Sequence, residues 1–305
     1  MVNLKIKFCK VEFDNPIILP SGIAQDIPND HENAIRAGAG GVTTKSLTVE
    51  PREGYPIPRI IKYEYGILNA VGIRNPGIKK GKELLRQFIN KHDLPIIVSV
   101  FATNGKDFET LVEEISQINP QFIELNLSCP HLTSEFGLPI GSGPEAAVIA
   151  VMSAKKHANK IPVIAKLTPN IPDIASIAKA CKYAGADAIC AINTVGSGMV
   201  IDVNKKKPVL GNKRGGVSGP GIKPVAVRCV YDIYEAVKIP IIGMGGITTW
   251  QDTVEMIMAG ANLVGVGSAV YTKGYKVYSE IKEGLSQFLE ENKASKLKDI
   301  IGIAH

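Results

Sequence analysis

The 305-residue chain has few of the features that mark disulfide frameworks, metal centres or membrane spans. It has five cysteines, which are Cys9, Cys129, Cys181, Cys190 and Cys229. Their number is odd, they are widely spread, and no two of them form a C-x-x-C pair, so neither disulfides nor a metal site is indicated. No apolar run reaches the roughly 18 residues of a membrane-spanning helix, and the N-terminus lacks the apolar stretch of a signal peptide. We therefore expect a soluble cytoplasmic protein with no bound metal.

Strong charge and the common catalytic groupings are also scarce. The net charge of +6 is modest and the basic residues have no interleaved aromatics, which is weak evidence for nucleic-acid binding. Paired inward carboxylates, as glycosidases need, are missing, and there is no Ser-His-Asp triad. Among the histidines only His131 lies near a candidate site, and the others, including His31, are interpreted as surface residues.

Short apolar runs alternate with amphipathic stretches along the chain, which is typical of a parallel βα architecture. The predicted strands are 17–21, 41–45, 95–101, 122–127, 162–167, 188–193, 240–243 and 263–267. The predicted helices are 30–37, 77–91, 106–118, 144–158, 172–184, 223–237, 249–259 and 275–292. This pattern predicts an α/β protein with a single (β/α)8 TIM-barrel domain over residues 1–305. An open doubly wound sheet is the alternative, but no G-x-G-x-x-G follows the first strand.

Three segments depart from the simple repeat. Arg59–Ala70 is predicted to be a hairpin inserted after the second strand, and Thr194–Gly216 a long polar loop after the sixth. Leu132–Gly143, after the fourth strand, is rich in Gly, Ser and Thr and is predicted to be a mobile lid. All three follow strands, so they are expected on the C-terminal face, where barrel active sites lie.

Lysine and asparagine side chains come at the ends of the predicted strands. Lys45 and Lys166 lie in apolar strands, and a buried lysine needs a partner. An ion pair with Glu124 could supply it, but an anionic ligand explains two inward lysines better. Asn69, Asn126 and Asn193 add amides that both donate and accept, which suits a planar ligand such as a pyrimidine or a flavin ring.

Glycine-rich turns follow the last two predicted strands, at Gly243–Gly246 and Gly265–Ser268. In barrels such turns bind phosphate through backbone N–H groups, and we favour that interpretation over tight turning alone. The stretch Glu124–His131 begins as a buried strand and then delivers Asn126, Ser128 and Cys129 to its C-terminal end. This position makes Cys129 a candidate acid–base group, although a lone cysteine is often a buried structural residue.

Several motifs together resemble class 1 dihydroorotate dehydrogenases, over nearly the whole chain and in the same order. They are Val42–Ser46, Leu68–Gly72 with Asn75–Gly77, Glu124–Pro130, Ala165–Asn170, Ile192–Thr194, Gly215–Gly219 and Ile242–Ile247. The resemblance is greatest to the B type. It implies an FMN-containing barrel that oxidises dihydroorotate to orotate in pyrimidine biosynthesis.

By motif position the resemblance also implies roles for individual residues. Cys129 is the implied base that removes the C5 proton, with Lys45 and Lys166 beside it, while the C6 hydride passes to FMN. The implied FMN-binding residues are Ser21, Lys45, Ser46, Ser99, Asn126, Lys166, Ile192, Gly219, Gly245, Gly246, Gly267 and Ser268. The implied substrate-binding residues are Lys45, Asn69, Ala70, Val71, Gly72, Ile73, Asn126, Asn193 and Thr194.

The B-type resemblance implies a partner as well: an iron–sulfur flavoprotein subunit that carries FAD and a 2Fe–2S cluster, in a dimer of heterodimers. This chain lacks the cysteine spacing for such a cluster. One departure is His131, where these enzymes commonly have Asn. Cys-Pro-His also resembles dihydropyrimidine dehydrogenases, which reduce uracil and thymine, so that activity is one alternative and a non-catalytic flavin-binding protein is another.

Overall fold

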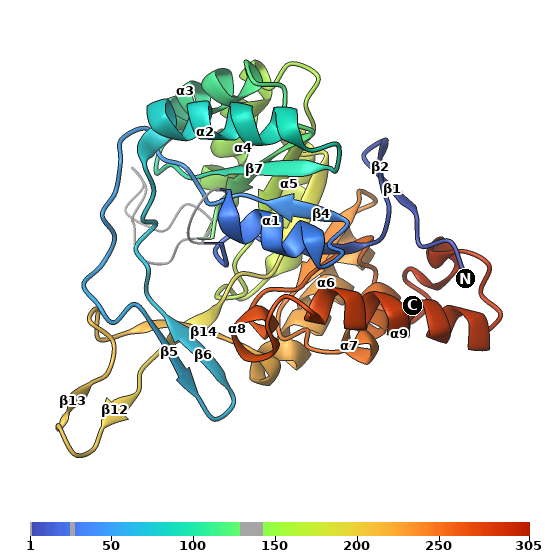
Figure 1. The fold of residues 1–305 in the computed structure, drawn as a ribbon. Coiled ribbons are helices and arrows are strands. Elements are labelled where there is room, and N and C mark those ends of the chain that lie inside the picture. The colour runs from blue at the N-terminus through green and yellow to red at the C-terminus, as the bar shows by residue number, and fades with distance from the viewer. Residues whose placement is uncertain (1, 25–27, 129–142) are drawn as a thin grey trace.

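The computed structural model describes residues 2–24, 28–128 and 143–305, and its centre is a closed barrel of eight parallel strands (Figure 1). The strands in barrel order are β3 (Ile17–Leu19), β4 (Gly41–Thr43), β7 (Ile96–Val100), β8 (Phe122–Asn126), β9 (Val163–Lys166), β10 (Ala188–Ala191), β15 (Ile241–Met244) and β16 (Leu263–Gly265). They are almost wholly buried, as expected of strands covered on both faces. The predicted (β/α)8 barrel is therefore confirmed.

Helices connect the strands and cover the outside of the barrel (Figure 1). They are α1 (Asn29–Arg36), α2 (Gly77–Lys91), α3 (Gly105–Ser116), α4 (Pro144–His157), α5 (Ile174–Tyr183), α6 (Lys223–Ala236), α7 (Trp250–Met258), α8 (Ala269–Lys273) and α9 (Val277–Glu291). Local sequence explains several starts: the Asn104 side chain accepts from Asp107 N at the start of α3, and Thr249 and Asp252 form a capping box on α7. Every predicted helix overlaps an observed one, and among the α-helices of the described residues the short α8 is the one that was not predicted.

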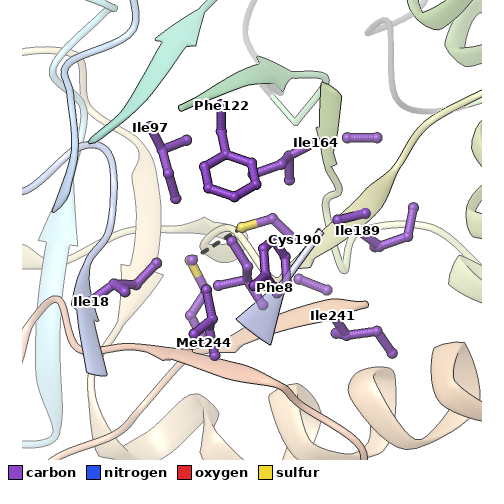
Figure 2. Packing of buried hydrophobic residues seen from close by; sticks show 14 of the residues in the cluster. Phe8, Ile18, Ile97, Phe122, Ile164, Ile189, Cys190, Ile241 and Met244 are labelled. Carbon is purple, nitrogen blue, oxygen red and sulfur yellow. Dashed lines mark hydrogen bonds between the residues drawn. The ribbon is translucent and has the colours of Figure 1, made fainter. Parts of the chain in front are cut away.

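An N-terminal hairpin that was not predicted, β1 (Ile6–Phe8) and β2 (Val11–Phe13), packs against the N-terminal ends of the barrel strands. Phe8 and Phe13 are fully buried and lie 5.6 and 5.9 Å, between ring centroids, from Phe122 at the start of β8. Figure 2 shows Phe8 and Phe122 among the aliphatic side chains of this core. The hairpin thus closes the end of the barrel opposite the strand ends that carry the polar residues.

Two inserted segments pair with each other beside the C-terminal end of the barrel. The predicted hairpin is β5 (Ile60–Tyr63) and β6 (Gly66–Asn69), and it continues through β14 (Gly215–Ser218) to β11 (Val195–Gly198) in one antiparallel sheet. Residues 194–216 are therefore not the simple loop that was predicted, because their pairing partner β6 lies far away in sequence. A two-stranded arm, β12 (Ile201–Asp202) and β13 (Lys207–Pro208), projects from this sheet (Figure 1).

The expectation that His31 is a surface residue was wrong: its side chain is fully buried and lies 5.5 Å, between ring centroids, from Phe88. It faces inward because α1 packs against the barrel and α2. Among residues 2–24, 28–128 and 143–305, no helix is long and apolar enough to cross a membrane.

Candidate functional site

Two neighbouring cavities open at the C-terminal ends of the barrel strands. The first is lined by Ser21, Gly22, Lys45, Ser46, Arg52, Tyr55, 69–73, Asn126, Lys166, Asn193, Thr194 and Gly216. The second is lined by 20–23, Asn69, Lys166, 192–194, Ser218, Ile222, 244–247, Gly265, Gly267 and Ser268. Because Ser21, Asn69, Lys166 and Asn193 belong to both walls, the cavities are two parts of one cleft. Most of the residues predicted for the site are brought together here.

A buried carboxylate lies beneath this cleft. Glu124 of β8 is fully buried, and its Oε1 accepts hydrogen bonds from Ser21 Oγ at 2.8 Å and from Ser99 Oγ at 2.9 Å. Lys166 Nζ donates to the same Ser21 Oγ, also at 2.8 Å. Ser21 thus bridges the ammonium group and the carboxylate, so Lys166 and Glu124 are linked through a hydroxyl group and not by the direct ion pair considered from the sequence.

A second series of hydrogen bonds runs from Ser99 to the asparagines of the cleft. Ser99 Oγ and Ser46 Oγ lie 2.9 Å apart, and Asn126 Nδ2 donates to Ser46 Oγ at 3.1 Å. Asn126 Oδ1 accepts from both the backbone N and the Oγ of Ser128, and Asn193 Nδ2 donates to that Oγ. Each amide is therefore held with a defined orientation of its oxygen and nitrogen.

Lys45 differs from Lys166 because no hydrogen bond from its Nζ is formed with any residue in the described part of the chain. It is 7% exposed, and burial lowers the pKa of its ammonium group to about 8, with Arg74 and Lys166 adding repulsion. A buried cation without a counter-charge is costly. The wall that holds Lys45 therefore favours an anionic ligand.

Arg52 is a second cationic group on this wall, and sequence reasoning missed it. Its backbone pairs with Asn75, while its Nε is buried and has no hydrogen-bond partner among the residues that the structure describes. A buried N–H group left without a partner costs about 1–3 kcal/mol, which a ligand acceptor would recover. In the sequence, Arg52 is marked only by its position in the segment that follows the second barrel strand.

The second cavity is floored by glycines that have no room for a side chain. A Cβ on Gly245 would lie 2.7 Å from Ala226 Cβ, and one on Gly246 would lie 2.8 Å from the backbone N of Lys223. Both residues have positive φ, 127° and 77°, which suits glycine. Gly245 and Gly246 both line the second cavity, so their backbone N–H groups are candidates for binding an anion there.

Comparisons with known proteins agree with this geometry. The family model for dihydroorotate dehydrogenase matches residues 3–289. The chain belongs to the dihydroorotate dehydrogenase family. It is 47% identical over 304 residues to the dihydroorotate dehydrogenase B (NAD(+)) catalytic subunit of Thermococcus kodakarensis, covering 100% of this chain and 99% of that one. Identity to the catalytic subunits of the same name is 47% over 304 residues for Pyrococcus furiosus, with 99% of each chain covered, and 41% over 305 residues for Methanocaldococcus jannaschii, with 99% and 98% covered.

Two residues expected at the site from the resemblance to dihydroorotate dehydrogenases, Ser99 and Gly219, do not line the cleft. A third part of the expected site lies outside the described residues. Ser99 is fully buried beneath the first cavity, where it bonds Ser46 and Glu124. Gly219 lies in the turn before the 3-10 helix η1 (Pro220–Ile222), where a Cβ would lie 2.7 Å from Gly66 Cα. Cys129 and His131, with the rest of the expected lid up to residue 142, lie outside the described residues.

Proposed function

We propose that this chain is a catalytic subunit of dihydroorotate dehydrogenase B and oxidises dihydroorotate to orotate in pyrimidine biosynthesis. The observation that carries the proposal is the first cavity, where Lys45 and the Arg52 Nε lie without partners in the described chain beside three asparagines. Orotate and dihydroorotate combine a carboxylate with a ring of alternating C=O and N–H groups. The cationic pair suits the carboxylate and the amides suit the ring.

The second cavity, together with the residues that it shares with the first, fits FMN. The glycine turns at Gly245–Gly246 and Gly267–Ser268 would hold its phosphate through backbone N–H groups. Lys166 lies in both walls, so its ammonium group would contact the flavin ring and stabilise negative charge on it. Bound FMN would supply the two-electron acceptor that the oxidation needs.

Within this proposal the remaining residues bind and orient the substrate. Lys45 would hold the carboxylate, and the backbone of residues 70–73 would close the wall around it. Asn69, Asn126 and Asn193 would fix the ring, because their amides are already oriented by neighbouring groups. Cys129, which lies outside the described residues, is proposed as the base for the C5 proton on the strength of its motif position.

We also propose a partner subunit, because the relatives are named catalytic subunits of an NAD(+)-dependent enzyme. The resemblance to B-type enzymes makes this partner an iron–sulfur flavoprotein with FAD and a 2Fe–2S cluster, in a dimer of heterodimers. That subunit would pass electrons from FMN to NAD. The cytoplasmic location expected from the sequence stays a prediction.

Anaerobic reduction tests the proposed activity directly. Purified protein reconstituted with FMN should be yellow, and the absorbance of its oxidised flavin should bleach on addition of dihydroorotate. Bleaching by dihydrouracil alone would instead support the dihydropyrimidine dehydrogenase-like activity suggested by His131. Dihydrouracil has no carboxylate to pair with Lys45 and Arg52, so we expect no bleaching with it. A protein that bound FMN but was bleached by neither compound would contradict the proposal.

A further inference from the structure

Glu124 is a buried acid that the proposed reaction does not use. Its strand places Phe122, Glu124 and Asn126 on one face because side chains alternate along a strand. Phe122 packs in the closed end of the barrel and Asn126 lines the first cavity, so Glu124 lies between the apolar core and the cleft. A carboxylate with no exposed surface is costly unless its hydrogen bonds and counter-charge repay its desolvation.

With Glu124 ionised, the hydrogen bonds around it have one consistent direction. Ser21 and Ser99 each have one hydroxyl proton, and both protons point to Glu124 Oε1. Ser21 Oγ is then free to accept from Lys166, and Ser99 Oγ must accept from Ser46. The Ser46 hydroxyl in turn accepts from the Asn126 amide. One carboxylate oxygen, Oε1, thus receives both branches of the network beneath the cleft, while Oε2 is buried and has no hydrogen-bond partner among the described residues.

We propose that Glu124 is a positioning residue that orients this network and balances the charge of Lys166 at the cleft, and this inference rests on the FMN site proposed above. Glu124 and Lys166 Nζ share Ser21 Oγ, each at 2.8 Å, so the carboxylate is the counter-charge bonded closest to that ammonium group. Part of the field of Lys166 is therefore cancelled. The remainder would set how strongly the site stabilises negative charge on bound FMN.

The charge balance predicts the direction of a change in reduction potential. Glu124→Gln removes the negative charge and leaves Lys166 uncompensated, so negative charge on the reduced flavin is stabilised more strongly. The equilibrium should move towards reduced flavin by at least tenfold, which is about 30 mV for a two-electron couple. A residue with a merely structural role would not move the potential in a fixed direction.

The matched control is Glu32→Gln. Glu32 also makes ion pairs, with Arg36 and Lys91, but on α1 at the outside of the barrel. The variant changes the net charge by the same amount and removes a carboxylate of the same type. The equilibrium constant for reduction of its FMN should stay within twofold of the value for the unsubstituted protein.

The test measures FMN binding and the FMN midpoint potential by anaerobic spectroelectrochemistry of the full chain. An unchanged or more negative potential in FMN-loaded Glu124→Gln would overturn the role of Glu124 while leaving the proposed function standing. If the unsubstituted protein did not bind FMN, the proposed function and this inference would both fall.

A second variant covers the case in which Glu124→Gln does not fold. Removing one member of a buried charge pair leaves the other uncompensated, whereas removing both is much less costly. The double variant Glu124→Gln/Lys166→Met should then recover a folded protein with a cooperative thermal transition. If the single variant failed and the double variant failed equally, the proposed charge balance would be wrong.

Discussion

The Asn69 side-chain amide donates to the backbone carbonyl oxygen of Gly216 at 3.4 Å, and the two residues are register partners between β6 and β14. They are 147 positions apart in the sequence and both line the first cavity. The contact joins the hairpin inserted after β4 to the segment that follows β10. One wall of the cleft therefore depends on the pairing of two insertions and not on the barrel itself.

The close approach at this wall predicts that Gly216→Ala weakens substrate binding. A Cβ at Gly216 would lie 2.1 Å from Thr194 Oγ1 and 2.6 Å from Thr194 Cβ, so Thr194 must move. Thr194 lines both cavities, and its displacement narrows the first one. We expect the dissociation constant for orotate to rise at least tenfold, or about 1.4 kcal/mol, with FMN retained. Isothermal titration of the FMN-loaded protein measures this change.

Gly221→Ala is the matched control for that wall. Gly221 lies in η1, and a Cβ there would meet only ordinary contacts, 3.6 Å from Tyr65 O and 4.0 Å from Tyr65 Cβ. Orotate affinity should stay within twofold of the unsubstituted protein. Equal affinities in Gly216→Ala and Gly221→Ala would show that the wall tolerates the added methyl group.

The barrel could be predicted from the sequence because its information is local. Alternating apolar runs and helix signals such as Asn104 and Thr249 lie within a few residues of the elements that they specify. The partner of β14 could not be predicted, since pairing with β6 depends on residues far away in the chain. The hairpin β1–β2 was missed because strands of three residues are too short to show a period.

Site prediction divides in the same way. Asn126 and Lys166 end barrel strands and Lys45 lies two residues beyond β4, so topology alone brought them together. Arg52 was missed because it reaches the cavity from an irregular segment with no periodic signal. The sequence raised Glu124 only as an ion-pair partner, because its hydrogen bonds to Ser21 and Ser99 depend on the register of three different parts of the barrel.

The second cavity predicts that Gly246→Ala reduces FMN affinity. Gly246 has φ of 77°, and a Cβ there would lie 2.7–2.9 Å from Lys223 backbone and Cβ atoms. The turn must shift to relieve this contact, which moves the backbone groups that face the phosphate. We expect the FMN dissociation constant to rise tenfold or more, measured by the quenching of flavin fluorescence on binding.

Gly274→Ala separates this effect from backbone strain. Gly274 follows α8 and has φ of 73°, but a Cβ there has no atom within 4 Å. Both variants should lose about 1 kcal/mol of stability from the positive φ, at which alanine is disfavoured, and Gly246→Ala should lose more because of its contact with Lys223. Only Gly246→Ala should lose FMN affinity, and a parallel loss in Gly274→Ala would attribute the effect to strain.

Burial of Lys45 predicts how the stability of the FMN-free protein depends on pH. Its pKa is about 8 in the folded protein against a usual value of 10.5, so between these values the unfolded chain binds more protons. Stability attributable to Lys45 therefore rises with pH over this window, by about 3 kcal/mol in full. Below pH 8 both states carry the charge and the folded state bears its whole desolvation cost.

The contribution of Lys45 to the pH dependence of stability is obtained by comparing the unsubstituted protein with a Lys45 variant. The comparison is needed because buried thiols change the stability in the opposite direction. Burial raises the pKa of Cys9 and of Cys181 to about 12, so these groups lower the stability as pH rises. Urea unfolding of the unsubstituted protein and of Lys45→Met at pH 7.5, 9 and 10.5 isolates the contribution of Lys45 to the free energy of unfolding. A stability difference that did not change with pH would contradict the burial of a charged Lys45.

The same group predicts the pH dependence of orotate binding. A bound carboxylate favours the ammonium form of Lys45, so binding above its pKa requires uptake of a proton. We expect an orotate dissociation constant that is constant below about pH 8 and rises about tenfold per unit above it. Isothermal titration in two buffers of different ionisation enthalpy would report the proton uptake. Lys45→Met should bind orotate at least tenfold more weakly and lose this pH dependence.

Cys129→Ser tests the proposed base. A serine hydroxyl has a much higher pKa than a thiol, so the deprotonated form needed to remove a proton is far rarer near neutral pH. General-base assistance contributes about 10²–10⁴-fold to the rate, and we expect flavin reduction by dihydroorotate to slow by at least 100-fold while FMN stays bound. Anaerobic stopped-flow absorbance measures this step.

Cys9→Ser is the control, because Cys9 lies away from the cleft, where its thiol donates to Asp187 O at a distance of 3.5 Å. The rate of flavin reduction in this variant should be unchanged. If Cys129→Ser reduced its flavin within a few-fold of the Cys9→Ser rate, another group would have to accept the C5 proton.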